Sequence, residues 1–331
     1  MHRLILALSL SLLFLAACAP AATKIPTAIP AVAPTVTPTT TNTPTPEPTS
    51  TPTGIPTPTP SPLEVTKDIT YTTSLQPDVR ARALDVYAPA EPGPWPVVVV
   101  VHGFQLRKEG YRLISEAIAN QGAVVFTIDW AAWTSPTRAA QGSGAKLREW
   151  SETVTCAVRF ARATASDYGG DSGRVTLVGH SAGGGLGLWE ALAGDDLEPL
   201  WEGLAATRGG PPPQIDCLAS GVSAYPDAFV GYGGAYTSLE FLKEEDPEMW
   251  EVTSPFAFIG GNPNLRIRFI HGEWDSMIPT EHVDRSLQLL EELTDAGYDA
   301  TWTTVDAGHN FSHTGPAGES TLRVIMEAVR D

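Results

Sequence analysis

Positively charged residues are scarce in this chain. Its 331 residues include 21 lysines and arginines but 38 aspartates and glutamates, so the formal net charge is −17 at pH 7. A surplus of negative charge repels phosphate groups, which argues against nucleic acid and anionic lipid as ligands. Two interpretations of the surplus remain open: a preference for cationic substrates, or an acidic surface that keeps the protein soluble.

The N-terminal segment contains no apolar run long enough to cross a bilayer. The N-terminal run, residues 4–15, is too short to span a membrane, and it follows the short positive segment Met1-His2-Arg3. It ends in Leu-Ala-Ala-Cys18, which resembles the lipobox of bacterial lipoproteins. The resemblance implies a signal peptide over residues 1–17 and a lipidated Cys18 that anchors the chain to a membrane. The alternative is an ordinary secretory signal with a chance cysteine, and both interpretations predict export.

Cysteine is also rare, since only Cys156 and Cys217 remain besides Cys18. Neither of the two lies in a context that predicts a nucleophile. Because an exported chain meets an oxidising compartment, we predict that they form a disulfide. The alternative is two separate buried thiols.

Residues 18–62 differ in composition from everything that follows. Threonine and proline dominate, no apolar periodicity is present, and proline blocks both helix and sheet hydrogen bonds. We therefore expect an extended, lipid-anchored linker that holds a folded domain, residues 63–331, away from the membrane. Whether this linker is glycosylated stays open.

In the folded part, strand-like and helix-like patterns alternate. Five consecutive valines at 97–101 are apolar on both faces, which is typical of a central parallel strand covered by helices on both sides. We predict an α/β domain with a doubly wound, mainly parallel sheet that begins with antiparallel strands. Strands are expected at 69–74, 83–87, 97–101, 123–128, 174–178, 218–222, 266–271 and 301–305. Helices are expected at 111–121, 146–163, 281–296 and 322–329.

Two stretches do not follow this alternation. Residues 195–213 are rich in glycine and proline, and we expect them to be irregular. Residues 225–262 form a long aromatic excursion, which we interpret as a small cap-like insertion that sets specificity.

A serine stands at a sharp turn in residues 174–185, RVTLVGHSAGGG. The pattern predicts a strand, a tight turn with Ser181 at its apex, and a helix. Such a turn crowds the backbone, so small residues are needed at Gly179 and Gly183. The alternative is a plain glycine-rich turn between a strand and a helix.

Active groups in doubly wound sheets lie just past the carboxyl ends of strands. This rule selects few polar residues here: His102, Asp129, Ser181, His271, Asp275 and His309.

From about residue 69 to its end, the chain resembles the α/β-hydrolase family, in its secreted serine esterase and lipase-like branch. The matching pieces are Val-His102-Gly, the turn around Ser181, His-Gly-Glu-Trp-Asp275 and Gly-His309, in the family's order of serine, acid and histidine. The resemblance implies that Ser181 is the nucleophile, His309 the general base and Asp275 the acid that orients the imidazole.

Other residues compete for these roles. His313 is an alternative base, and Asp129 is an alternative acid, although it is more typical of a residue that organises loops. We expect His102 and His271 to be hydrogen-bonded turn residues and His180 to point away from the substrate. The spacing of His309 and His313 fits a metal on a helix, but no strand-end carboxylate cluster supports one, so no metal is predicted.

Two backbone N–H groups are expected to form an oxyanion hole. One belongs to Ala182, and the second to Phe104, with Gln105 as the alternative because the chain lacks the glycine run that many esterases carry here. Trp130 and Trp133 are expected beside the pocket, where they either line an acyl or aromatic site or pack the loop.

The sequence thus predicts an exported serine hydrolase, lipid-anchored to the outer face of a bacterial membrane. It would cleave small-molecule carboxylic esters through an acyl-enzyme, without a cofactor, nucleic acid or obligate protein partner. A serine peptidase of the same fold and a non-catalytic surface binding protein remain the alternatives.

Overall fold

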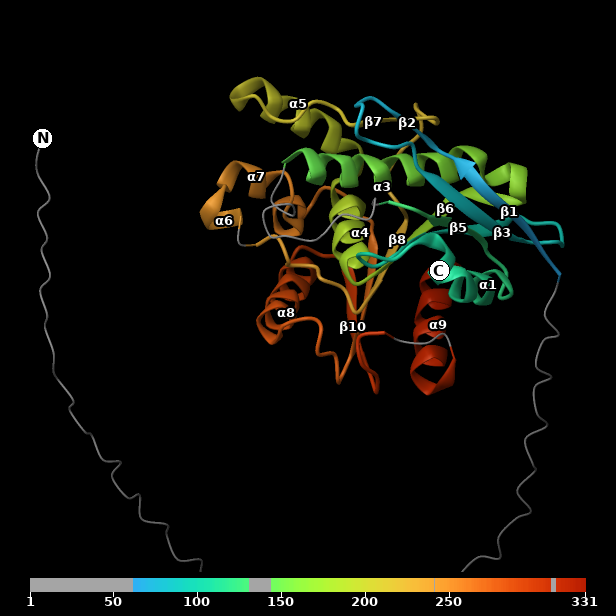
Figure 1. The fold of residues 1–331 in the computed structure, drawn as a ribbon. Helices are drawn as coiled ribbons and strands as arrows, with labels where there is room; N and C mark the ends of the chain where they lie inside the picture. Colours follow the sequence, from blue (N-terminus) through green and yellow to red (C-terminus); the bar gives the residue numbers. More distant parts are fainter. Residues whose placement is uncertain (1–61, 131–143, 241, 311–313) are drawn as a thin grey trace, which may run out of the picture. The chain divides into compact units, whose positions relative to one another are not determined.

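Eight strands form one sheet in the part of the chain that the structure, a computed structural model, describes: residues 62–130, 144–240, 242–310 and 314–331 (Figure 1). Its strands are β1 (Leu63–Thr70), β3 (Ala83–Pro89), β4 (Trp95–Val101), β5 (Val124–Ile128), β6 (Gly170–His180), β8 (Ala228–Tyr232), β9 (Arg266–Gly272) and β10 (Asp299–Val305). The order across the sheet is β1-β3-β5-β4-β6-β8-β9-β10. β3 is antiparallel to β1 and β5, and the strands from β5 to β10 are parallel, which confirms the predicted sheet and its antiparallel start.

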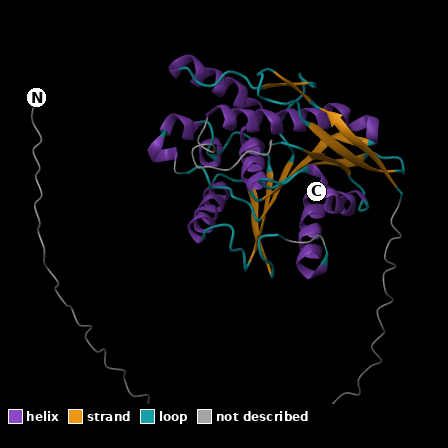
Figure 2. Ribbon diagram, in the orientation of Figure 1, coloured by secondary structure: helices purple, strands orange, loops and turns teal. Residues whose placement is uncertain are grey.

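Helices cover both faces of this sheet (Figure 2). They are α1 (Arg112–Ala119), α3 (Gly144–Thr164), α4 (Ala182–Ala193), α5 (Leu197–Arg208), α6 (Leu242–Glu245), α7 (Pro247–Glu251), α8 (Thr280–Asp295) and α9 (Gly315–Arg330). α1 and α9 pack into the core on one face, and α3, α4, α5 and α8 into the core on the other.

The valines of β4 show why the sheet needs two cores. Val97, Val99 and Val101 belong to one core, whereas Val98 and Val100 belong to the other, and all five are buried. Successive side chains of a strand point to opposite faces, so an unbroken apolar run requires cover on both sides. β4 pairs with β5 and β6 and is an interior strand, as predicted.

The expectation that residues 195–213 are irregular is wrong. Residues 197–208 form helix α5, which buries Leu197, Trp201 and Leu204 at helical spacing. Pro199 and Gly203 are accommodated within the helix, whereas the run of glycines and prolines at 209–213 follows it, and Gly209 ends the helix in the left-handed conformation.

The predicted strand at 218–222 is also wrong. Leu218 is exposed, and the chain instead forms the short strand β7 (Ile215–Cys217), which pairs with β2 (Thr72–Ser74) in a separate two-stranded sheet. The sheet strand of this region is β8, whose five residues are all buried, so residues 228–232 do not belong to the excursion.

Residues 233–262, without residue 241, contain the short helices α6 and α7 and lie between β8 and β9. The predicted disulfide between Cys156 on α3 and Cys217 on β7 is confirmed. Within the described ranges, each helix falls short of the length or the apolarity needed to cross a membrane. The predicted signal peptide, Cys18 and the linker up to residue 61 lie outside those ranges.

Candidate active site

Ser181 stands between the end of β6 and the start of α4, with backbone angles of φ 54° and ψ −124°. Few residues with a side chain adopt such a conformation, because the β-carbon crowds the neighbouring backbone. The turn is tight: a β-carbon on Gly179 would lie 2.4 Å from the carbonyl oxygen of Gly183. The predicted strand, turn and helix are therefore present, with the serine hydroxyl at the apex.

Two residues from distant parts of the chain meet this hydroxyl. The Nε2 atom of His309 lies 2.9 Å from the Oγ atom of Ser181, although 128 positions separate the two residues. The Nδ1 atom of His309 lies 2.8 Å from an oxygen of Asp275. His309 follows β10 and Asp275 follows β9, so the sheet brings all three side chains to its carboxyl edge.

Asp275 is held in its ionised form by hydrogen bonds. Burial acts to raise the pKa of its carboxyl group, but the bonds from the His309 ring and from the backbone N–H groups of Ile278 and Met277 outweigh burial and lower the pKa below its ordinary value. An ionised acceptor at this position fixes the proton of His309 on Nδ1. The other ring nitrogen, which faces Ser181, is then free of a proton and is able to accept one.

Other histidines also lie at strand ends, namely His102, His180 and His271. The Nδ1 atom of His102 lies 2.8 Å from the carbonyl oxygen of Gly103, and the ring stacks on Trp130. The expectation of a hydrogen-bonded turn residue is wrong for His271, which lies within β9 and whose buried Nδ1 has no hydrogen-bond partner among the described residues. Burial lowers the pKa of both His102 and His271. His180 is buried and does not line the cavity described below, and His313 lies outside the described residues.

Asp129 is not in contact with His309. Its carboxylate accepts the backbone N–H of Lys108 at 2.9 Å, and its carbonyl oxygen accepts the hydroxyl of Tyr71 at 2.8 Å. Asp129 thus ties the segment after β4 to the start of the sheet, as expected of a residue that organises loops.

The two residues expected to supply oxyanion donors, Ala182 and Phe104, line the same cavity, which is described below. Ala182 is the first residue of α4, where backbone N–H groups have no acceptor within the helix. Phe104 follows the end of β4, and the next residue, Gln105, has a left-handed backbone with φ 59°. Helix N-termini favour negative charge, so the start of α4 beside Ser181 is a suitable place for an oxyanion.

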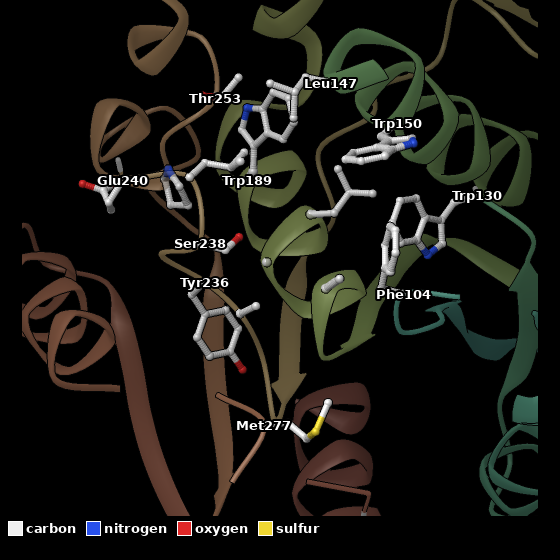
Figure 3. Close-up of a pocket in the computed structure, with 16 residues that line it drawn as sticks. Phe104, Trp130, Leu147, Trp150, Trp189, Tyr236, Ser238, Glu240, Thr253 and Met277 are labelled. Atoms are coloured by element: carbon white, nitrogen blue, oxygen red, sulfur yellow. The ribbon is translucent and has the colours of Figure 1, made fainter. Parts of the chain in front are cut away.

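A largely apolar cavity of about 380 Å³ lies beside Ala182, the residue that follows Ser181 (Figure 3). Phe104 and Trp130 lie together at one end, and Glu240 and Thr253 lie at the opposite end. Its walls come mainly from α3, α4 and the segment after β8, and they include Leu147, Trp150, Leu186, Trp189, Tyr236 and Leu239. The cavity is large enough for a substrate group much bigger than acetyl.

The structure places Trp130 in the wall of this cavity, whereas Trp133 lies outside the described residues. Sequence reasoning missed Trp150 and Trp189 as wall residues. Both lie on the inward face of a helix, which is the same signal that a core residue gives. In the described ranges no cluster of histidine, cysteine and acidic side chains has the arrangement of a metal site.

Parts of the chain are similar in sequence to known proteins. A family model described as BD-FAE matches residues 84–208. Esterase LipC of Mycobacterium tuberculosis is 27% identical over 281 residues, which cover 73% of this chain and 61% of that protein. The chain thus spans about three fifths of the length of this curated relative.

Solved structures also resemble this one. An esterase of Thermogutta terrifontis with bound propionate is 19% identical with a TM-score of 0.55, and the match covers 78% of this chain and 93% of that one. Esterase B of Lactobacillus rhamnosis, inhibited by a phosphonate, is 16% identical with a TM-score of 0.58, covering 81% and 85% of the two chains. By its sheet order, its strand–turn–helix with a serine at the apex and its similarity to these structures, the chain has the α/β-hydrolase fold.

Proposed function

We propose that this protein is a serine hydrolase that cleaves carboxylic esters of small molecules through an acyl-enzyme intermediate. The observation that carries the proposal is the continuous contact from Asp275 through His309 to Ser181, with separations of 2.8 and 2.9 Å. These distances are within the range for proton transfer along hydrogen bonds. The relatives named as esterases support the same reaction class.

In the first half-reaction, His309 takes the proton of the Ser181 hydroxyl while the oxygen attacks the ester carbonyl carbon. The resulting oxyanion accepts hydrogen bonds from the backbone N–H groups of Ala182 and of Phe104, or of Gln105 in place of Phe104. When the intermediate collapses, the carbon–oxygen bond to the alcohol breaks and His309 gives its proton to the leaving alcohol. The acid moiety then remains attached to Ser181.

In the second half-reaction, water replaces the alcohol. His309 takes a proton from the water, the resulting hydroxide attacks the acyl carbon, and the proton is passed back to Ser181 as the free acid leaves. Asp275 stays ionised throughout and stabilises the positive charge that His309 carries twice in each cycle. The low pKa of Asp275 fits this role.

The cavity supports a proposal for the acid moiety of the substrate. Ala182 and Phe104 belong both to the cavity wall and to the proposed oxyanion hole, so a bound ester carbonyl would point its acid moiety into the cavity. The walls are mainly aromatic and aliphatic, and such walls gain free energy from burying apolar groups. We therefore expect bulky apolar acid moieties to be accepted.

A panel of p-nitrophenyl esters and a fluorophosphonate probe tests the activity. The full chain should hydrolyse the esters and be labelled at Ser181, and Ser181→Ala should abolish both. Ser172→Ala, which removes an exposed serine near the start of β6, is the matched control and should change neither. Equal rates for wild type and Ser181→Ala would exclude the proposal.

The same esters and probe, tested beside a peptide library, separate the alternatives. Cleavage of a peptide library at rates comparable with the esters would favour a peptidase, and a folded chain that neither reacts with the probe nor cleaves esters would favour a binding protein. Peptidases use the same three side chains, so the relative rates on esters and peptides are the measurement that separates the two reactions.

We also propose that the chain is exported and anchored by a lipid on Cys18. The Leu-Ala-Ala-Cys18 motif and the Cys156–Cys217 disulfide, which is typical of oxidising compartments, support this location. Metabolic labelling with an alkyne fatty acid in a bacterial host should label the wild-type chain and leave Cys18→Ala unlabelled. Labelling that persists in Cys18→Ala would contradict the proposal.

A further inference from the structure

His180 precedes the nucleophile directly, but its side chain points away from the cavity and into the protein. The ring is buried, and it stacks on Tyr232 of β8 with ring centres 4.7 Å apart. Both of its nitrogens have partners. Nδ1 lies 2.5 Å from the hydroxyl oxygen of Tyr111, and Nε2 lies 3.1 Å from the backbone carbonyl oxygen of His309.

The partners decide which nitrogen of His180 carries the proton. A carbonyl oxygen only accepts hydrogen bonds, so Nε2 must carry the proton and donate it to His309. Nδ1 then accepts the hydrogen of the Tyr111 hydroxyl. Burial lowers the pKa of His180 to about 4, although the bond to the His309 carbonyl counteracts this, so the ring is neutral at pH 7 and this pattern is retained.

Tyr111 extends the chain of hydrogen bonds to the loop after β4. Its hydroxyl oxygen accepts the backbone N–H of Gly103 at 2.8 Å. Gly103 packs directly on the pair, since a β-carbon there would lie 3.2 Å from Nδ1 of His180 and 3.3 Å from the Tyr111 hydroxyl oxygen. The bond to Tyr111 therefore sets the position of the residue just before Phe104.

These contacts join three separate segments. One carries the nucleophile Ser181, one carries the base His309, and one carries Phe104, the proposed oxyanion donor. His180 contacts the first two directly and the third through Tyr111. His180 bonds to the backbone carbonyl of His309, and the side chain of the same residue carries the nitrogen that faces Ser181.

We propose that His180, together with Tyr111, is a positioning residue that sets the separation between the base and the nucleophile and the placement of the oxyanion loop. The inference rests on the proposed hydrolase function. Neither residue touches the substrate, so they act on the geometry of the three reacting segments. Misplacing a reacting group by about 1 Å lowers the rate by about 100-fold, which makes such a bond important even though it lies outside the cavity.

A set of substitutions separates this role from packing. Tyr111→Phe keeps the ring but removes the hydroxyl, and we expect kcat for a short p-nitrophenyl ester to fall about 10-fold while KM changes less than about twofold. Tyr87→Phe is the matched control, because Tyr87 is an equally buried tyrosine on β3, away from His180. It should leave kcat unchanged.

At position 180, two substitutions of similar size have different hydrogen-bonding capacity. His180→Leu removes both bonds, and we expect kcat to fall about 100-fold. His180→Gln keeps an N–H group that reaches the His309 carbonyl, so its kcat should be at least fivefold higher than that of His180→Leu. Equal kcat values for the two variants, a kcat within twofold of wild type, or a change confined to KM would overturn the inference.

One measurement does not depend on activity. In crystal structures of the wild type and of His180→Leu, the separation between Nε2 of His309 and Oγ of Ser181 should increase from 2.9 Å to beyond about 3.5 Å. An unchanged separation would overturn the positioning role even if the wild type proved inactive. Failure of the proposed function would instead appear in the wild type alone, as absent ester hydrolysis and absent probe labelling.

Discussion

Gly183 packs so closely against His102 that no side chain fits between the two residues. A β-carbon on Gly183 would lie 2.3 Å from the carbonyl oxygen of His102 and 2.5 Å from that of Val101. Val101 is the last residue of β4, and His102 follows it. The backbone there is not free to move, because β4 is paired with a strand on each side. This approach holds the first turn of α4, and with it Ser181, against the sheet.

We therefore expect Gly183→Ala to be severely damaging. The extra methyl group must push α4 away from β4, which should destabilise the fold by about 1–3 kcal/mol or more and displace Ser181. Urea unfolding and probe labelling measure the two effects. Gly203→Ala is the control: it lies in helix α5 with open space around it and should stabilise the protein by up to about 1 kcal/mol. Equal stability of the two variants would contradict the packing argument.

Asp275→Asn should lower kcat by about 10⁴-fold with little change in KM. An amide at this position no longer requires the His309 proton to be on Nδ1, and it does not offset the charge of the imidazolium. Steady-state kinetics with a p-nitrophenyl ester measures the loss. Asp129→Asn, which affects only the loop after β4, should cost far less, and equal losses in the two variants would reopen the choice of acid.

Glu190 on α4 gives the stability of the protein a dependence on pH. Its side chain is fully buried, with a hydrogen bond to the Thr155 hydroxyl at 2.9 Å, and burial raises its pKa well above the ordinary value. The folded state therefore binds this proton more tightly than the unfolded chain does. The stability that follows is fully present below about pH 4.5, the ordinary pKa of a glutamate, and is lost as pH rises towards the folded-state pKa.

Glu190→Gln removes this titration, so the variant should gain free energy of unfolding relative to wild type as the pH increases from 5 to 8. Urea unfolding at both pH values measures it. Glu202→Gln, at an exposed position of α5, is the control and should give the same difference from wild type at both pH values. A pH-independent difference for Glu190→Gln would show that Glu190 does not carry this linkage.

Replacing both Cys156 and Cys217 by alanine should lower the free energy of unfolding by about 2–4 kcal/mol, because the bond closes a loop between residues 61 positions apart. Neither cysteine lines the cavity beside Ser181, so we expect kcat to be unchanged. Dithiothreitol should destabilise the wild type but leave the double variant unaffected. If dithiothreitol destabilised the wild type and the double variant equally, the disulfide would not be the source of this stability.

Filling the cavity should change substrate preference selectively. Leu239 is a partly buried wall residue, and Leu239→Trp would reduce the free volume. We expect kcat/KM for hexanoate esters to fall at least tenfold and that for acetate esters to change little, because steric loss applies to the larger acid moiety. Leu200→Trp, at an exposed position of α5, is the control. Equal changes in kcat/KM for hexanoate and acetate esters would show that the acid moiety does not bind in this cavity.

Much of the fold could be predicted because local patterns report on backbone conformation and burial. The valines of β4 require two covered faces wherever the strand lies, and Gly-His180-Ser181-Ala-Gly describes a turn that only small residues allow. β8 escaped prediction because Ala228–Tyr232 stands among aromatic residues of a loop region, and its strand conformation depends on pairing with β6 and β9. Helix α5 was missed because the glycines and prolines beyond its end obscured its apolar face.

Local sequence patterns were enough to predict the order and type of most elements, the serine at the turn and a short set of polar side chains at strand ends. Which of these side chains meet follows from the packing of the folded chain: Asp275 rather than Asp129 contacts His309, Trp150 lines a cavity, and His180 reaches the backbone of His309. Periodicity reports which face of an element is buried, whereas contacts between residues of different elements depend on how whole elements pack.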